Sequence, residues 1–291
     1  MTDPTPARTI AFQGQPGAYS DLACRQVFPA MATLPCDAFE DAFAAVREGR
    51  AALAMMPIEN SVAGRVADIH HLMPESGLYI IGEHFERVNH HLLGLPGAKL
   101  DAIRTVRSHV HALGQCRNFI RAHRLTPVVA ADTAGSAAEI KERGDKTIAA
   151  IASELAGQIY GLVSLAENIE DAEHNTTRFL IMAREPKWPP RGGPAVTTFV
   201  FNVRNVPAAL YKALGGFATN GVNMTKLESY MVGGRFAATQ FYADVEAHPD
   251  DRPLKLALEE LAFFSTEVKI VGVYPAHPLR IAARQQERGE D

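Results

Sequence analysis

With 291 residues, the chain is long for a single hydrophobic core, so two or three compact units are expected. Its hydrophobic share of 47% and charged share of 21% are typical of a globular protein and argue against disorder. The formal net charge of -4 argues against nucleic acid as a partner. No apolar run could span a bilayer, and the first residues lack the order of a signal peptide, so we expect a cytoplasmic protein without membrane contact.

The cysteine and histidine patterns argue against structural cross-links. Cys24, Cys36 and Cys116 are widely spaced and form no C-x-x-C pair, which favours reduced thiols. The 11 histidines include the pair His90-His91, but no H-E-x-x-H motif or Cys/His quartet accompanies them. The sequence therefore predicts neither a disulfide framework nor a metal site.

The N-terminal part alternates short apolar strands with helical patterns. A turn at residues 13–17 carries two glycines before a helix, an arrangement that can bind an anion but is more often a simple turn. Strands are expected at residues 9–12, 33–36, 51–56, 78–83 and 89–94, and helices from near residues 19, 38 and 64.

Three consecutive polar residues, Glu59, Asn60 and Ser61, follow the fully apolar strand at 51–56. Ligands bind at the carboxyl ends of strands in open α/β sheets, whereas a purely structural loop has little need of three such side chains. We therefore expect this turn to belong to a site.

The same organisation recurs further along the chain. Strands are expected at residues 106–109, 127–130, 147–151 and 162–165, and Ser108, Asp132 and Ser153 stand where they could cap the intervening helices. A last strand at 177–182 is expected to cross back to the first half. Such a crossover predicts two α/β halves with a cleft between them.

The segment from Asn175 to Leu180 places polar side chains where this returning strand begins. Alone, it is typical of a solvated loop that enters a strand. The alternation of a strand puts Thr177 and Phe179 on one face and Arg178 on the other.

A Pro/Gly-rich stretch at residues 184–194 indicates a domain boundary. Beyond it, the patterns predict strand 197–203, helix 208–219, strands 224–231 and 236–245, helix 252–264 and strand 268–274. This β-α-β-β-α-β order is a ferredoxin-like arrangement.

The chain resembles prephenate dehydratases that carry a C-terminal ACT regulatory domain. The segments that carry the resemblance are Gly14-Gln15-Pro16-Gly17-Ala18-Tyr19-Ser20, Pro57-Ile58-Glu59-Asn60-Ser61, Ser108-His109-x-x-Ala112-Leu113-x-Gln115-Cys116, Asp132-Thr133-Ala134 and Asn175-x-Thr177-Arg178-Phe179. Each is short, but their order and the full-length coverage make the joint match specific.

This resemblance implies an α/β fold of two periplasmic-binding-protein-like subdomains with substrate in the cleft between them, followed by the ferredoxin-like ACT domain. The expected boundaries are 1–188 for the catalytic domain, 189–195 for a linker, 196–280 for the ACT domain and 281–291 for a polar tail. Within the catalytic domain, subdomain 1 is expected at about 1–94 and 175–188, and subdomain 2 at about 95–174. The implied reaction converts prephenate to phenylpyruvate, water and carbon dioxide without a cofactor.

The family's essential threonine carries over to Thr177, whose hydroxyl is expected to hydrogen-bond the leaving oxygen. Arg178 is expected either to bind substrate or to hold the sheet, and the proton donor is left open between Glu59 and His174. The catalytic set is therefore Thr177, Asn60 and Glu59, and the substrate-binding set is Ser20, Ser61, Thr133, Arg178 and Phe179.

The resemblance also implies feedback inhibition by L-phenylalanine and assembly as a homodimer or homotetramer. Ala208 replaces a glycine of the family's effector loop, and Tyr230-Met231 replaces an Arg-Pro pair. The expected effector-binding residues are Asn205, Ala208, Ala209, Leu210, Asn223, Met224, Glu228 and Ser229.

Two alternatives remain at this point. Arogenate dehydratase performs the same elimination on a substrate with an amino group in place of the keto group. A catalytically silent amino-acid sensor would use the same fold, although the presence of Thr177, Asn60 and Ser61 argues against it.

Overall fold

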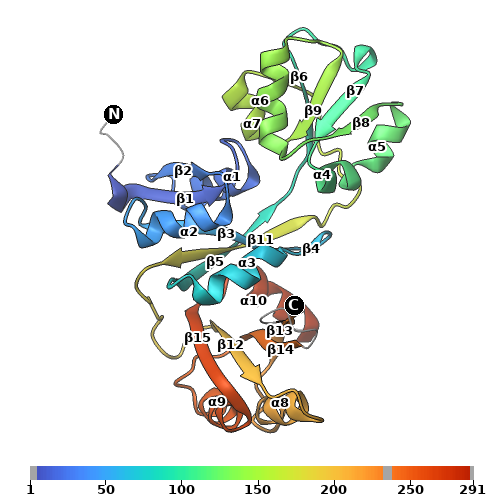
Figure 1. Cartoon of the computed structure of the whole chain (residues 1–291). Helices are drawn as coiled ribbons and strands as arrows, with labels where there is room; N and C mark the ends of the chain where they lie inside the picture. Colours follow the sequence, from blue (N-terminus) through green and yellow to red (C-terminus); the bar gives the residue numbers. More distant parts are fainter. Residues whose placement is uncertain (1–4, 232–237, 289–291) are drawn as a thin grey trace. The chain divides into compact units, whose positions relative to one another are not determined.

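The structure is a computed structural model that describes residues 5–231 and 238–288 (Figure 1). The chain forms two compact units. Unit 1 comprises Met1–Val66 and His84–Phe179, and unit 2 comprises Ala67–Glu83 and Leu180–Asp291. Two strands, β5 (Tyr79–Arg87) and β11 (Thr176–Ala183), therefore run through both units. In the described part of the chain, no helix is long and apolar enough to cross a membrane.

The first lobe of unit 1 is built on a sheet in the order β11-β3-β1-β2. Strand β1 pairs in parallel with both β2 and β3. The helix α2 is held by an apolar face of Ala42, Phe43, Ala45 and Val46, which are all buried. The elements are β1 (Thr9–Gln13), α1 (Tyr19–Val27), β2 (Ala32–Cys36), α2 (Phe39–Arg47), β3 (Leu53–Asn60) and β4 (Gly64–Arg65), after a 3-10 turn at Pro6–Arg8.

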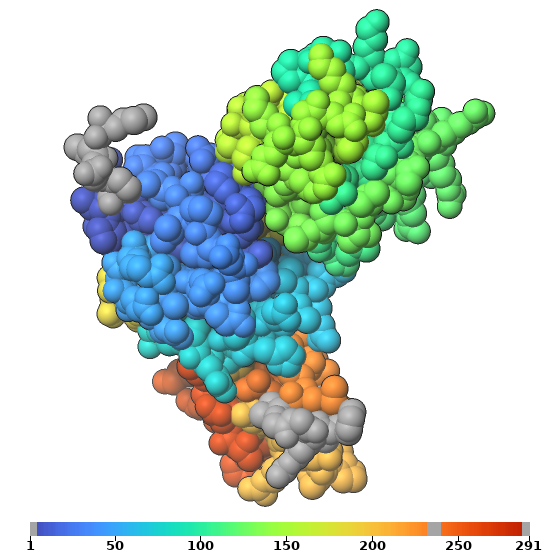
Figure 2. All heavy atoms as spheres, turned by 45° about the horizontal axis from the view of Figure 1, so that its top comes forward, coloured from blue at the N-terminus to red at the C-terminus, as the bar shows by residue number. Residues whose placement is uncertain are grey.

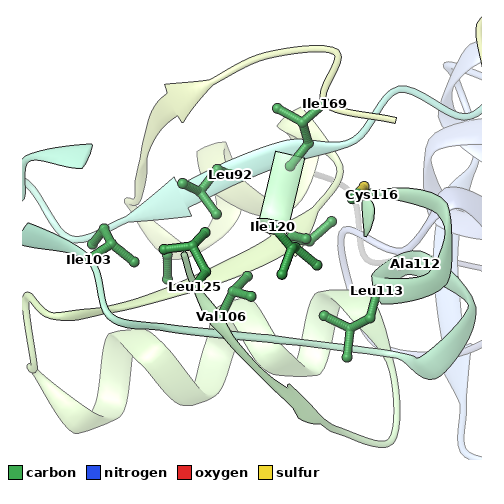
Figure 3. Close-up of a cluster of buried hydrophobic side chains, with 11 residues drawn as sticks. Leu92, Ile103, Val106, Ala112, Leu113, Cys116, Ile120, Leu125 and Ile169 are labelled. Atoms are coloured by element: carbon green, nitrogen blue, oxygen red, sulfur yellow. The ribbon is translucent and has the colours of Figure 1, made fainter. Parts of the chain in front are cut away.

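The second lobe of unit 1 is a separate sheet in the order β10-β6-β9-β7-β8. Figure 3 shows one of its clusters of buried side chains, which includes Leu92, Val106 and Ile120. The elements are β6 (His91–Gly94), β7 (Thr105–Ser108), α4 (Val110–Gln115), α5 (Arg117–Ala122), β8 (Thr126–Val129), α6 (Thr133–Arg143), β9 (Ile148–Ala152), α7 (Glu154–Tyr160) and β10 (Val163–Ala166).

Unit 2 contains the expected β-α-β-β-α-β order, and its strands follow the order β13-β14-β12-β15-β5. Helices α8 and α9 pack on this sheet through a core that includes Phe199, Phe201 and Phe217. The expected strand at 236–245 begins at Ala238, because residues 236–237 lie outside the described part. The elements are α3 (Ala67–Leu72), β12 (Ala195–Val203), α8 (Ala209–Thr219), β13 (Met224–Met231), β14 (Ala238–Val245), α9 (Arg252–Phe264), β15 (Ser265–Pro275) and α10 (Pro278–Arg288).

The division into units differs from the expected domain boundaries, because the segment 67–83 packs with the C-terminal half. Ile80 of β5 pairs in parallel with Gly272 of β15. Lys269 Nζ donates a hydrogen bond of 2.6 Å to the carbonyl of Pro74. No boundary signal marks this segment, since the contacts come from residues almost two hundred positions away.

Residues 281–288 of the expected polar tail are helical, as part of α10 (Pro278–Arg288). Arg280 anchors this helix with two hydrogen bonds, of 2.7 and 3.1 Å, to the buried carboxylate of Glu83. Arg284 lies 3.5 Å from Glu246. The ion pairs of Arg280 and Arg284 thus hold the polar helix α10 against the rest of unit 2.

Candidate functional site

Asn60 and Thr177 meet where β3 ends and β11 begins. Strand β3 extends four residues beyond the expected end at residue 56, so Glu59 and Asn60 lie in the strand and not in a loop. The side-chain Nδ2 of Asn60 donates to Thr177 Oγ1 at 3.0 Å and to Asn175 Oδ1 at 2.8 Å. The neighbouring strands therefore bring together two residues that are 117 positions apart.

The orientation of the Asn60 amide is fixed by the backbone. Its Oδ1 accepts hydrogen bonds from the N–H groups of Val62 and Ala63, at 2.9 and 2.7 Å. Because a backbone N–H can only donate, the oxygen must face this turn and the NH₂ group must face Thr177. Thr177 Oγ1 is thus an acceptor for Asn60, which leaves its own proton available to hydrogen-bond a bound ligand.

Ser61 fastens the turn to the start of β11. Its Oγ donates to the carbonyl of His174 at 2.7 Å and accepts from the N–H of Thr176 at 2.9 Å. Its backbone N–H donates to the carbonyl of Thr176 at 2.9 Å. The structure therefore gives Ser61 a role in positioning Asn60 beside Thr177.

Glu59 and Arg178 form an ion pair on the alternate positions of the same two strands. Arg178 Nη1 lies 2.8 Å from Glu59 Oε1, and the arginine side chain is 2% exposed whereas the glutamate side chain is 31% exposed. Phe179 is also buried, at 1% exposure. These placements favour a structural role for Arg178 and Phe179 and engage Glu59 with a guanidinium.

The remaining expected substrate residues lie on other elements. Ser20 is buried in the first turn of α1. Thr133 begins α6, directly after Asp132, whose side chain accepts from the backbone of Gly135. Within the described part of the chain, neither Ser20 nor Thr133 is hydrogen-bonded to Asn60 or Thr177.

The glycine turn before α1 is a joint between the lobes. Ser153 Oγ donates to the carbonyl of Gly17 at 2.5 Å, and the Tyr160 hydroxyl donates to the carbonyl of Pro16 at 3.0 Å. The N–H of Gly17 is bound by Asp21 at 2.8 Å. The blue and green atoms of the two lobes meet in Figure 2. This turn thus serves lobe packing, with Gly17 already occupied within the chain.

A second junction, which the sequence did not suggest as a cluster, joins two of the quoted motifs through His90, which belongs to neither. The Tyr19 hydroxyl lies 2.5 Å from the carbonyl of Asn89 and 3.0 Å from His90 Nδ1, and His90 Nε2 lies 2.9 Å from Gln115 Oε1. Burial raises the pKa of Tyr19 well above 10.0 and lowers the pKa of His90 from 6.5, with the Gln115 contact opposing the second shift. Both side chains are therefore neutral near pH 7. A cavity of about 240 Å³ borders Tyr19 and Asn89.

His109 is a further polar residue at a helix start in the second lobe. Its Nδ1 accepts from the N–H of His111 at 3.3 Å, so the imidazole caps α4. Burial, followed by the charge of His111, lowers the pKa of His109 from 6.5, although Asp132 acts in the opposite direction. The neutral ring keeps a lone pair on Nδ1 for this cap.

The expected effector residues of unit 2 lie on two segments. Asn205, Ala208, Ala209 and Leu210 belong to the turn before α8 and to its first residues, and Ala208 has a left-handed backbone with φ of 64°. The second segment is β13 and the residue before it. There, Asn223 Nδ2 lies 3.4 Å from Glu246 Oε2, Glu228 pairs with Lys226 at 3.4 Å, and Met224 and Ser229 lie on the strand itself.

Tyr230, which stands at a changed position of the expected effector motif, connects β13 to α3. Its hydroxyl hydrogen-bonds Nδ1 of His70, which is fully buried. The rings of Tyr230 and Tyr242 both pack against the same imidazole, with centroids 5.5 and 5.0 Å away. The histidine pair His70-His71 thus has a packing role here.

The site can be compared with known proteins. The family model for prephenate dehydratase matches residues 10–187. A bifunctional N-acyl-homoserine lactone acylase/prephenate dehydratase from Komagataeibacter europaeus is 57% identical over 94% of this chain and 98% of its own length. An arogenate dehydratase/prephenate dehydratase from Arabidopsis thaliana is 40% identical, with 93% of this chain and 73% of that protein covered.

Two solved structures are similar over almost the whole chain. One, described as GqqA, a novel type of quorum quenching acylase, has a TM-score of 0.89 and 57% identity, and 94% of this chain and 100% of that chain are covered. The other is prephenate dehydratase from Arthrobacter aurescens in complex with L-Phe, with a TM-score of 0.84 and 31% identity, and 97% and 98% of the two chains are covered. The match over residues 10–187 and these identities show that the chain belongs to the prephenate dehydratase family, a family of carbon–oxygen lyases.

Proposed function

We propose that this protein converts prephenate to phenylpyruvate in the cytoplasm, as a step of L-phenylalanine biosynthesis. The observation that carries the proposal is the hydroxyl of Thr177, which accepts a hydrogen bond from Asn60 and so directs its own proton elsewhere. In the proposed reaction, the Thr177 hydroxyl uses that proton to hydrogen-bond the ring hydroxyl of prephenate as it leaves, without transferring it.

The chemistry needs no redox change. The bond between the ring and one carboxylate breaks, its electron pair enters the ring, and the carbon–oxygen bond to the ring hydroxyl breaks, so that carbon dioxide and hydroxide leave as the ring becomes aromatic. A hydrogen bond that strengthens as charge develops on the leaving oxygen lowers the barrier. Thr177 is too weak an acid to supply a free proton, so we assign it polarisation of the leaving group.

The two candidate proton donors, Glu59 and His174, differ in their contacts and exposure. Glu59 Oε1 accepts a hydrogen bond from Arg178 Nη1 at 2.8 Å, so this carboxylate oxygen is already engaged by a guanidinium. His174 has an exposed side chain, next to a carbonyl that Ser61 binds. We therefore assign Glu59 to the support of Arg178 and retain His174 as the candidate donor.

Substrate anchoring is assigned to Ser20 and Thr133 at the starts of α1 and α6. Asp21 and Asp132 already accept from the N–H groups of Gly17 and Gly135 at these helix starts, so the two hydroxyls are assigned to hydrogen-bond the carboxylates of prephenate. Arogenate differs only in carrying an amino group, and relatives with both names are similar to this chain.

The decisive assay follows the alkaline absorbance of phenylpyruvate after incubation of the purified protein with prephenate. We expect product from the wild type and at least a roughly hundredfold lower kcat for Thr177→Ala. A parallel incubation with arogenate decides substrate preference. A protein that folds but turns over neither substrate would be the amino-acid sensor instead.

For regulation, we propose that the β-α-β-β-α-β part of unit 2 is an ACT domain that binds L-phenylalanine near Asn223 and Ala208. Support comes from the related structure solved in complex with L-Phe. Inhibition by L-phenylalanine should weaken in Asn223→Ala while kcat without effector is unchanged. Unchanged inhibition would place the effector elsewhere.

We also propose a homodimer or homotetramer assembled through these domains. Strand β13 lies at the end of its sheet order, and a sheet edge presents unpaired backbone groups that a second copy can satisfy. Light scattering coupled to size-exclusion chromatography measures the mass directly. A monomer at micromolar concentration would refute this proposal.

A second candidate activity is hydrolysis of N-acyl-homoserine lactones. The observation that favours it is the 57% identity to a relative described as both an acylase and a prephenate dehydratase. The reaction adds water across the amide and releases a fatty acid and homoserine lactone. Mass spectrometry of both products, from wild type and Thr177→Ala, tests the activity and whether it uses the same site.

A further inference from the structure

We propose that Asn175 is a positioning residue for the elimination, acting through Asn60 to orient the hydroxyl of Thr177. The inference rests on the proposed prephenate dehydratase function. Asn175 directly precedes β11 and is 1% exposed. Its Oδ1 accepts the second N–H of the Asn60 amide at 2.8 Å, while the first N–H goes to Thr177.

The hydrogen-bond directions in this network follow from groups whose roles are unambiguous. The backbone N–H groups of Val62 and Ala63 fix which side of the Asn60 amide is the oxygen. The Asn60 NH₂ group must then donate to Asn175, so the atom of Asn175 that faces it must be an acceptor. The backbone turn at Val62 and Ala63 thereby fixes the orientation of the Asn60 amide, and through it which atoms of Asn175 and Thr177 act as acceptors.

Asn175 is itself held firmly by its backbone. Its carbonyl accepts from the N–H of Val88 at 2.8 Å, and its N–H donates to the carbonyl of Ala172 at 3.2 Å. An acceptor that is fixed in this way limits the rotation of the Asn60 amide about its last side-chain torsion. Without it, the Asn60 N–H group that now faces Asn175 would be left without its partner, and the amide could turn away from Thr177.

The choice of an amide at this position carries a cost. In the described structure, the Nδ2 atom of Asn175 is buried and has no hydrogen-bond partner. Such a group is unfavourable, so its presence calls for an explanation. An aspartate would supply the same acceptor without the orphaned donor, but it would put a negative charge beside a site that must bind a dianion and release hydroxide. The neutral amide oxygen of asparagine accepts from Asn60 and adds no negative charge beside the site.

A double-mutant cycle separates positioning from simple packing. We expect Asn175→Ala to lower kcat about tenfold to hundredfold, with a smaller change in KM, because a fixed hydrogen bond is lost. In the Thr177→Ala background, the same substitution should lower kcat by less than about twofold, because the hydroxyl it orients is already absent. Full additivity of the two losses would overturn the inference.

A conservative variant and a matched control guard against misfolding. Asn175→Asp keeps the acceptor, so its kcat should exceed that of Asn175→Ala, while its charge should raise KM for the dianionic substrate. A kcat no better than that of the alanine variant overturns the inference. Asn202→Ala removes an asparagine of unit 2 with a buried, unpartnered oxygen, and it should keep the wild-type kcat.

The outcomes distinguish this inference from the proposed function. A folded wild type without turnover refutes the proposed function, and the inference falls with it. Wild-type turnover that is unaffected by Asn175→Ala refutes the inference alone. Circular dichroism and urea unfolding of each variant show whether a loss of kcat occurs in folded protein.

Discussion

Replacing Ala208 by glycine should stabilise the protein, although glycine is unfavourable in the interior of a helix. Ala208 precedes α8 with φ of 64° and ψ of 7°, in the left-handed region. An L-residue in this region costs about 1–2 kcal/mol, whereas glycine adopts it readily. The Ala208 side chain is exposed, so its removal sacrifices little buried surface.

The expected gain is smaller than the strain, because glycine also gives the unfolded chain more freedom. That entropic term is about 0.4–1 kcal/mol. The net stabilisation is therefore about 0–1.6 kcal/mol, with a midpoint of about 0.8 kcal/mol, which for a chain of this size raises Tm by up to roughly 6 °C. Urea unfolding of the full chain, monitored by circular dichroism, measures the change in the free energy of unfolding.

Ala209→Gly is the matched control, since the chemical change is identical and the residue is the first of α8. Within helical geometry the substitution should cost about 0.5–1 kcal/mol. Opposite signs for the two variants would confirm the left-handed backbone at Ala208. If Ala208→Gly lowers stability as Ala209→Gly does, the reasoning about strain is refuted.

Three further predictions follow from the first unit. Gly17→Ala should lower both Tm and kcat, because the added Cβ would lie 2.7 Å from the backbone of α7. The control Gly77→Ala also places a side chain on a left-handed backbone, but its Cβ has open space around it, so it should lower Tm only. The free energy of unfolding should fall as pH drops below about 6.5, because burial lowers the pKa of His90 and the unfolded chain therefore binds a proton that the folded chain does not. Urea titrations at pH 7.5 and 5.5 should show this drop, and it should be smaller in a His90→Gln variant. At pH 8, Cys24 and Cys116 of the native protein should react slowly with iodoacetamide, because burial raises the pKa of both thiols from 9.0. Rapid labelling of either thiol, detected by mass spectrometry, would contradict this.

The sequence predicted those features that depend on local patterns. Alternation along β11 correctly separated Thr177 from Arg178, and the apolar run in residues 51–56 located β3. Family membership followed from short motifs in a fixed order. The β-α-β-β-α-β order of the C-terminal part followed from the periodicity of its apolar residues and the lengths of the apolar segments.

Features that depend on distant contacts could not be predicted. Asn60 lies within the strand because β3 continues beside β11, and the ion pair between Glu59 and Arg178 joins residues 119 positions apart. The role of Tyr19 required knowing that His90 and Gln115 lie next to its hydroxyl. All of these residues except His90 belonged to a quoted motif, but a motif does not show which of its residues contact one another in the fold.

The sharing of unit 2 between two separated segments has a consequence for biosynthesis. Glu83 leaves the ribosome 197 residues before Arg280, the guanidinium that its carboxylate binds. At about 5–20 residues per second, that interval is roughly 10–40 s. During this time, the segment 67–83 has neither β15 nor α10 to pack against, so unit 2 can fold only after synthesis is almost complete. A chain that stops before β15 would therefore lack both Gly272, which pairs with Ile80, and Lys269, which binds Pro74, so the segment 67–83 would have no C-terminal partner to pack against.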